Sequence, residues 1–185
     1  IPLRTISQSG MHSMFENCFS LTSAPQSLPA TSNTGEAPYK DMFDYCTSLL
    51  EAPCLPATTL DANCYLEMFN ACRTITTVPE LPATNIPAGA YKGMFTNCTS
   101  LTTGTYLSYE SVGSDAFHSM YKGCTSLTTI PVIPELLTPG AFTSIFDGCT
   151  SLQLYSSSSE EHPYAYKIPF KNTSSDSNTL YYFMR

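Results

Sequence analysis

Hydrophobic residues recur along the chain in a pattern built around single cysteines. The clearest copy is YKGMFTNCTSLT, from Tyr91 to Thr102. Within it, Tyr91, Met94, Phe95 and Cys98 stand at positions i, i+3, i+4 and i+7, the spacing of one face of a helix about two turns long. Each copy is therefore predicted to bury one short helical stripe.

Six cysteines mark the copies, at spacings of 28, 26, 26, 26 and 25 residues. They are Cys18, Cys46, Cys72, Cys98, Cys124 and Cys149. An aromatic residue lies three positions before each cysteine, and Leu or Ile lies three positions after it. A fixed period of this length indicates a solenoid in which each unit packs only on its neighbours. We expect the six thiols to form a buried structural ladder, because free cysteine is among the most buried residue types.

Prolines limit the strand that follows each predicted helix. In TTVPELPAT, from Thr76 to Thr84, Pro79 cannot donate a ladder hydrogen bond. Each repeat should therefore carry only a very short parallel strand, of about three residues, after its Leu or Ile.

The units MFTNCTSLT, MFDYCTSLLEAPCLPATTL and MFNACRTITTVPELPATNI resemble the BspA-like, treponemal-type bacterial leucine-rich repeats. The likeness covers about residues 11–155. It implies an α/β leucine-rich-repeat solenoid, in which each repeat of about 26 residues is a short helix plus a very short parallel strand. It also implies an extracellular or cell-surface bacterial protein concerned with adhesion and with binding host proteins.

The ends depart from the repeat. Residues 1–10 resemble the tail of an incomplete repeat, and residues 11–155 contain about six repeats. From Ser156 the period stops, so residues 156–185 are interpreted as an irregular C-terminal cap over the open edge of the solenoid. A mobile tail is the alternative. The chain begins Ile1-Pro2 without a charged-then-apolar leader, which suggests a processed or trimmed piece.

Composition narrows the range of partners. The chain has 185 residues, a net charge of −7 and only eight Lys and Arg. Nucleic acids and anionic membrane surfaces are disfavoured, because both call for a basic patch. No apolar run approaches the roughly 18 residues of a membrane span.

Catalytic and metal-binding patterns are missing from the sequence. The ladder cysteines are single, with no C-x₂-C pair and no His at ligand spacing, so no metal is expected. His12 and His118 occupy the same outward slot of two repeats, which favours a surface role. Without a nucleophile motif or a phosphate-cradling loop, we expect neither an enzyme nor a cofactor.

Two groups of residues lie off the repeat. Cys54 and Cys64 form a candidate local disulfide if the protein is secreted, and two unrelated free thiols are the alternative. The copy after Cys98 reads TGTYLSYESVGSD, where Thr105 and Ser108 replace prolines and two tyrosines are gained. Its candidate binding residues are Tyr106, Tyr109 and Glu110. The alternative is that both tyrosines pack against the neighbouring repeat.

These patterns favour a non-catalytic binding or adhesion module of a secreted or surface-anchored bacterial protein, with a protein or glycan ligand. A purely structural spacer that presents other domains is the alternative, and a cytosolic scaffold is a third.

Overall fold

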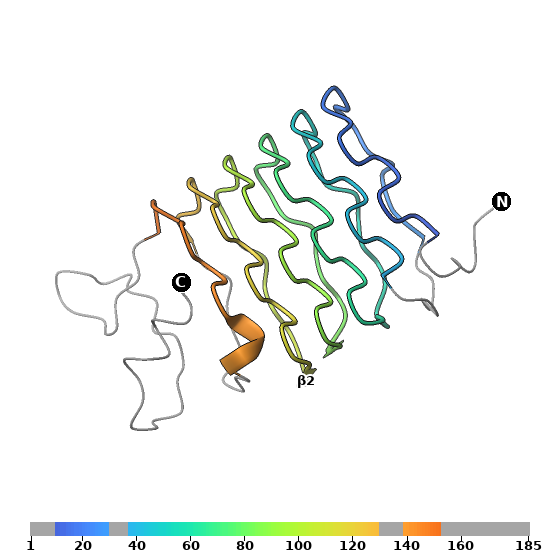
Figure 1. Ribbon diagram of the computed structural model, residues 1–185, viewed down its shortest axis with the longest axis vertical. Helices are drawn as coiled ribbons and strands as arrows, with labels where there is room; N and C mark the ends of the chain where they lie inside the picture. Colours follow the sequence, from blue (N-terminus) through green and yellow to red (C-terminus); the bar gives the residue numbers. More distant parts are fainter. Residues whose placement is uncertain (1–9, 30–36, 130–138, 153–185) are drawn as a thin grey trace.

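The computed structural model describes residues 10–29, 37–129 and 139–152, which form a stack of six coils (Figure 1). We label the coils by their described residues: coil A, 10–29; coil B, 37–60; coil C, 61–86; coil D, 87–112; coil E, 113–129; and coil F, 139–152. Each coil lies beside the next one in sequence, so residues about 26 positions apart are neighbours in space (Figure 1). The predicted solenoid is therefore present in the described residues.

Regular secondary structure is sparse in this stack. Strand β1 (Asn85–Ile86) ends coil C and pairs in parallel with β2 (Ser111–Val112) at the end of coil D. Thr103 and Thr129 form a single parallel bridge just after the repeat Leu, where the short strand was predicted. The 3-10 helix η1 (Pro139–Phe142) begins coil F.

The predicted short helix is wrong: no α-helix occurs in residues 10–29, 37–129 or 139–152. In its place each coil carries a run of turns. The Tyr91 N–H donates to the Ala116 carbonyl of coil E at 2.9 Å, whereas the Met94 N–H donates back to the Tyr91 carbonyl at 3.2 Å. This alternation continues along residues 89–98 and recurs in residues 11–18, 37–46, 63–72 and 115–124. Residues 141–149 form the same turn bonds within the coil and accept the bonds that come from coil E. We call these segments together the turn ladder.

Residues in the left-handed backbone conformation explain why the turn ladder is not helical. Gly89, Gly93 and Asn97 have φ of 64°, 62° and 59°, so every fourth residue has a backbone conformation that no right-handed helix contains. In the turn from Tyr91 to Met94, Gly93 is the third residue, the position at which a type II turn requires positive φ. A period of four places Tyr91 and Phe95 on one side of the chain, as a helix does. The hydrophobic pattern therefore imitates a helical face.

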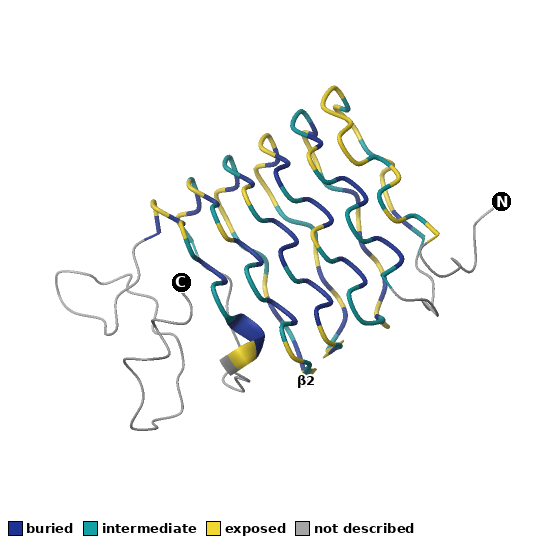
Figure 2. Cartoon of the chain, in the orientation of Figure 1, coloured by how far each residue is buried: buried dark blue, intermediate teal, exposed yellow. Residues whose placement is uncertain are grey.

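Two columns of stacked rings run through the core. Their centroids are 4.9–6.0 Å apart between successive coils. One column is Tyr39, Tyr65, Tyr91, Phe117 and Phe142, and the other is Phe15, Phe43, Phe69, Phe95, Tyr121 and Phe146. The inner sides of coils B to F are buried, whereas coil A is largely exposed (Figure 2). Each coil thus contributes a similar cross-section to one continuous core.

The predicted incomplete repeat at residues 1–10 and the predicted cap at residues 156–185 lie, except for Gly10, outside the described residues.

Candidate interaction surface

The structure does not bring Tyr106 and Tyr109 together. Tyr106 is 60% exposed, whereas Tyr109 is 8% exposed and packs against Phe117 and Phe142 with ring centroids 6.0 and 5.9 Å away. Burial raises the pKa of Tyr109 to about 12. Glu110 is exposed at the end of the same segment. Two residues three apart in an extended segment face opposite ways, so the predicted three-residue patch is not a continuous surface.

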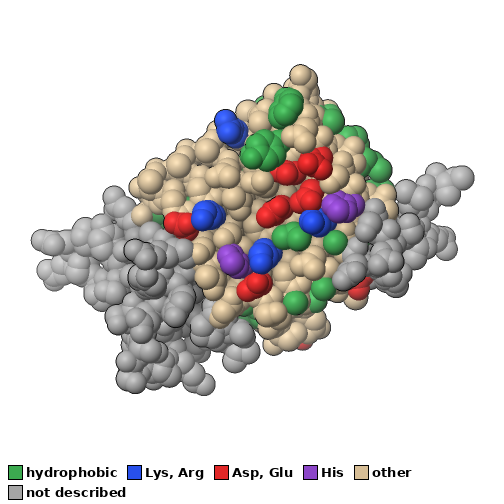
Figure 3. Space-filling model, viewed as in Figure 1, with side chains coloured by type: hydrophobic (Ala, Val, Ile, Leu, Met, Phe, Trp, Pro, Cys, Tyr) green, Lys and Arg blue, Asp and Glu red, His purple; other side chains and the backbone are tan. Residues whose placement is uncertain are grey.

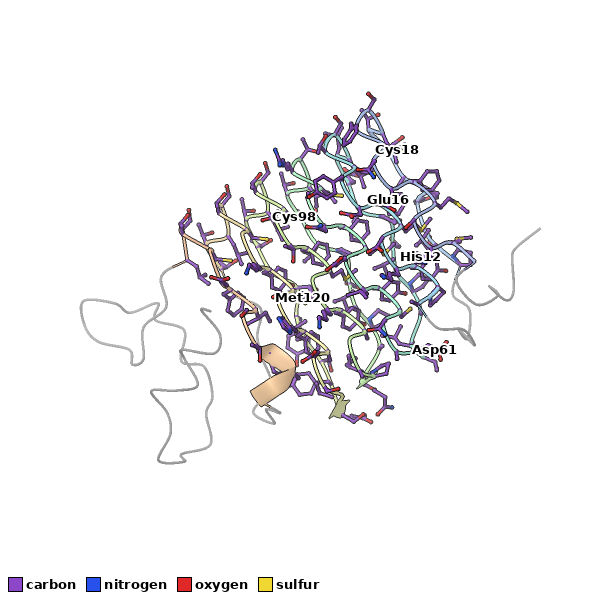
Figure 4. The ribbon with its side chains drawn as sticks, viewed as in Figure 1. His12, Glu16, Cys18, Asp61, Cys98 and Met120 are labelled. Carbon is purple, nitrogen blue, oxygen red and sulfur yellow. The ribbon has the colours of Figure 1, made fainter. Side chains whose placement is uncertain are left out.

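Five of the six ladder cysteines are buried, and each donates its thiol hydrogen to a carbonyl of the preceding coil. The Sγ–O distances are 3.0–3.1 Å, and Cys98, for example, donates to Phe69. Burial raises the pKa of Cys46 to about 11, so the thiolate needed for reaction is scarce there. Cys18 departs from the prediction because it is exposed in coil A, with no earlier coil among the described residues to cover it. Figure 4 shows Cys18 in coil A and Cys98 inside the stack.

The candidate disulfide between Cys54 and Cys64 is not present, since neither cysteine belongs to a disulfide. Cys54 is exposed on the side of the coil that bears the prolines, where its backbone forms an isolated parallel β-bridge with Ser27. Cys64 is buried in the turn ladder, and its backbone carbonyl accepts from Tyr39. The two residues belong to different sides of their coils, which explains why they do not pair.

Two cavities lie on the proline-bearing side of coils A to C. One, of about 330 Å³, is enclosed by residues 22–26 of coil A and by residues 50–52 and 54 of coil B. The other, of about 320 Å³, is enclosed by residues of coils B and C between Glu51 and Pro82. They share Glu51, Ala52 and Cys54, so together they form one trough, which we call the proline trough. The prolines that line it are visible in the sequence, but the hollow between the coils was not predicted from them.

Interrupted pairing accounts for the proline trough. Coils A and B are joined here by only a few bonds, such as Leu50 N–H to the Thr22 carbonyl at 3.2 Å. Between residues 50–57 and 76–83, all of which are described, no backbone hydrogen bond is formed. Proline has no N–H to donate, so adjacent segments that carry prolines cannot form a complete ladder. The result is a hollow lined by Pro56, Pro79 and other apolar side chains.

Exposed large apolar side chains gather near the same coils. In the described residues they are Met14, Phe19, Tyr45, Leu50 and Tyr106. Four of the five belong to coils A and B, but Met14 and Tyr45 lie in the turn ladder. Leu50, 59% exposed, is the one of the five that lines the proline trough. Exposed apolar groups that adjoin a hollow are typical of interaction sites.

The turn ladder has a different surface, which carries most of the charge in Figure 3. Lys92 pairs with Asp115 at 3.1 Å, and the pKa of Asp115 is lowered by this hydrogen bond. Burial and the neighbouring Asp41 raise the pKa of Asp44 to about 6. The Oδ1 atoms of Asp41 and Asp44 are buried without a protein hydrogen-bond partner.

Neither a cluster of potential metal ligands nor a long apolar helix occurs in the described residues. In residues 10–29, 37–129 and 139–152, no cluster of three or more His, Cys, Asp or Glu could hold a metal ion. The described part of the chain also contains no helix with the length and hydrophobicity needed to span a membrane. His12 lies 3.3 Å from Asp41, and His118 lies 3.8 Å from Asp115, so each histidine is beside an aspartate on the turn-ladder surface.

Comparison with known proteins yields two solved structures. The chain is 17% identical to a leucine-rich-repeat protein of T. pallidum, over 83% of this chain and 73% of that one, with a TM-score of 0.41. It is 16% identical to a leucine-rich-repeat protein of Bacteroides ovatus, over 76% of this chain but only 32% of that one, with a TM-score of 0.30. No protein-family model matches the sequence, and a comparison with curated proteins finds no match.

The chain's own geometry shows the repeat architecture, namely coils of about 26 residues, a buried Leu or Ile in each, and very short parallel strands. The solved structures to which the chain is similar are both bacterial leucine-rich-repeat proteins, the kind of protein that its Phe-x-x-Cys-x-x-Leu unit resembles.

Proposed function

We propose that this chain is a non-catalytic recognition module of a secreted or surface-anchored bacterial protein, and that it binds a partner protein through the proline trough. The observation that carries the proposal is that two adjoining cavities on coils A to C form one trough, and that the exposed side chain of Leu50 lines it. Interface energy is concentrated in a few side chains that are desolvated together, and a lined hollow provides such a place. The extracellular setting and the role in adhesion rest on the resemblance of the repeat units.

Leu50 and Tyr106 provide a matched test. They are exposed to nearly the same extent, 59% and 60%, but only Leu50 lines the proline trough. Leu50→Asp should weaken adhesion to immobilised host matrix proteins by at least about tenfold, as expected for a central interface residue. Tyr106→Asp should leave adhesion unchanged. Both variants should melt like the parent, and an array of glycans run in parallel reports the alternative ligand class.

The opposite result is equally informative. Loss of adhesion with Tyr106→Asp alone would move the interface to coil D, and equal adhesion by the parent and both variants would remove the proline trough from consideration.

A spacer role is the second candidate. It is favoured by the uniform ring columns and thiol row, which repeat from coil to coil and would suit a rigid rod. A spacer predicts adhesion that depends on neither Leu50 nor Tyr106.

A further inference from the structure

We propose that the partner segment that occupies the proline trough is an extended polypeptide with apolar side chains and flanking Lys or Arg residues. This inference rests on the proposed function and adds the chemistry of the ligand to it. Three properties of the trough carry the argument: its walls, its main-chain groups and its charge.

The walls are mainly apolar and contain no aromatic ring. Residues that line the two cavities include Ala24, Pro25, Leu55, Pro56, Val78 and Pro79. Sugar rings are usually held against aromatic faces, and no Phe, Tyr or Trp lines either cavity. Aliphatic and proline side chains suit the methylene and methyl groups of a peptide instead. The two volumes, about 320 and 330 Å³, are at the lower end of the range for small-ligand sites, so the trough fits a few residues of extended chain.

Two residues that line the trough, Val78 and Glu80, donate no backbone hydrogen bond to the described residues. Because residues 50–57 and 76–83 form no backbone hydrogen bond with each other, the N–H groups of Val78 and Glu80 are not used in pairing between these coils. An extended peptide can supply the missing partners, as it does when it adds to the edge of a sheet. A rigid small molecule has no matching row of donors and acceptors. The trough thus favours a main chain as ligand.

The charge of the trough is negative. Glu51 belongs to both cavities and Glu80 to the second, and both side chains are exposed. No Lys, Arg or His lines either cavity, and the whole chain has a net charge of −7. An acidic peptide would be repelled at this surface, whereas a cationic one would be attracted and its encounter rate raised at low salt.

The experiment uses two end-blocked, fluorescently labelled hexapeptides, Lys-Pro-Leu-Lys-Pro-Leu and Glu-Pro-Leu-Glu-Pro-Leu, titrated with the full chain. Fluorescence anisotropy at about 25 and 250 mM salt should show that the cationic peptide binds at least tenfold more tightly at low salt and loses that advantage at high salt. The double variant Glu51→Gln with Glu80→Gln should lose about three- to tenfold in affinity, the range for two exposed ion pairs. Glu110→Gln is the matched control, since Glu110 is exposed but does not line the trough.

Equal affinity of the two peptides, or the same loss in Glu110→Gln as in the double variant, would overturn the cationic assignment. If neither peptide binds while Leu50→Asp still abolishes adhesion, the proposed function stands and this inference fails. If Leu50→Asp also leaves adhesion unchanged, both fail.

Discussion

Replacement of Gly93 by Ala tests whether the segment is a turn ladder or a helix. The two backbones predict changes of opposite sign in the free energy of unfolding. In the middle of a helix, Gly→Ala increases stability by up to about 1 kcal/mol. Gly93 instead has φ of 62°, and a Cβ there would lie 2.9 Å from the Glu67 Cγ of coil C. The left-handed conformation costs an L-residue about 1–2 kcal/mol. Ala recovers about 0.4–1 kcal/mol by restricting the unfolded chain.

We therefore expect Gly93→Ala to lower the free energy of unfolding by about 1 kcal/mol, with a further loss from moving Glu67. At about 2–4 °C per kcal/mol for a chain of this size, the melting temperature should fall by several degrees. Urea unfolding can be followed by tyrosine emission, since the chain has 12 Tyr and no Trp.

Gly140→Ala is the control. Gly140 lies in η1, has no positive φ, and would have no heavy atom within 4 Å of an added Cβ. This variant should be neutral or slightly more stable than the parent. A Gly93→Ala protein that is more stable than the parent would refute the turn ladder.

Three further predictions follow from the core, the charges and the thiols. Phe95→Ala should lower the free energy of unfolding, measured in denaturant melts, by about 3–5 kcal/mol, because Phe95 is buried. Thr102→Ala should lower it far less, because Thr102 is exposed. Equal losses in the two variants would contradict the ring column. The pKa of Asp44 is raised from 3.8 to about 6 in the folded state. The contribution of this carboxyl group to the stability of the fold is therefore fully present below pH 3.8 and is lost as the pH rises through 6. Asp44→Asn should therefore stabilise the protein at pH 8, by up to about 1 kcal/mol after allowance for solvent screening, and not at pH 4. A maleimide reagent should label Cys18 and Cys54 rapidly in native protein, and rapid labelling of four or more thiols would contradict the buried ladder.

The hydrophobic pattern predicted the coil and its buried residues because both depend only on side-chain period. Tyr91, Phe95 and Cys98 are all buried, as their spacing requires. The hydrophobic pattern did not distinguish a helix from a chain of turns, since turns with a period of four residues place nearly the same side chains on one face as a helix does. Coil D carried a signal, since Gly89, Gly93 and Asn97 recur every four residues and are residue types that tolerate positive φ. In coil B, however, the equivalent positions are Ala37, Asp41 and Tyr45, so the signal is not repeated there.

The candidate site was harder to predict because it depends on pairing between coils. An unusual repeat drew attention to Tyr106 and Tyr109, but one is a surface residue and the other belongs to the core. The proline trough arises from hydrogen bonds that residues 50–57 and 76–83 do not make with each other. The prolines in each segment indicate that a strand cannot continue there, but they do not indicate that two segments 26 residues apart leave a hollow between them.

The uniform cross-section of the coils makes their number adjustable. Removal of residues 87–112, one whole coil, would connect Ile86 to Gly113 and place coil E directly on coil C. Tyr121 would then stack on Phe69, and the Cys124 thiol would find the Phe69 carbonyl that now accepts from Cys98. Length in such a molecule is a quantity that can change in steps of one coil while every surviving contact keeps its chemistry.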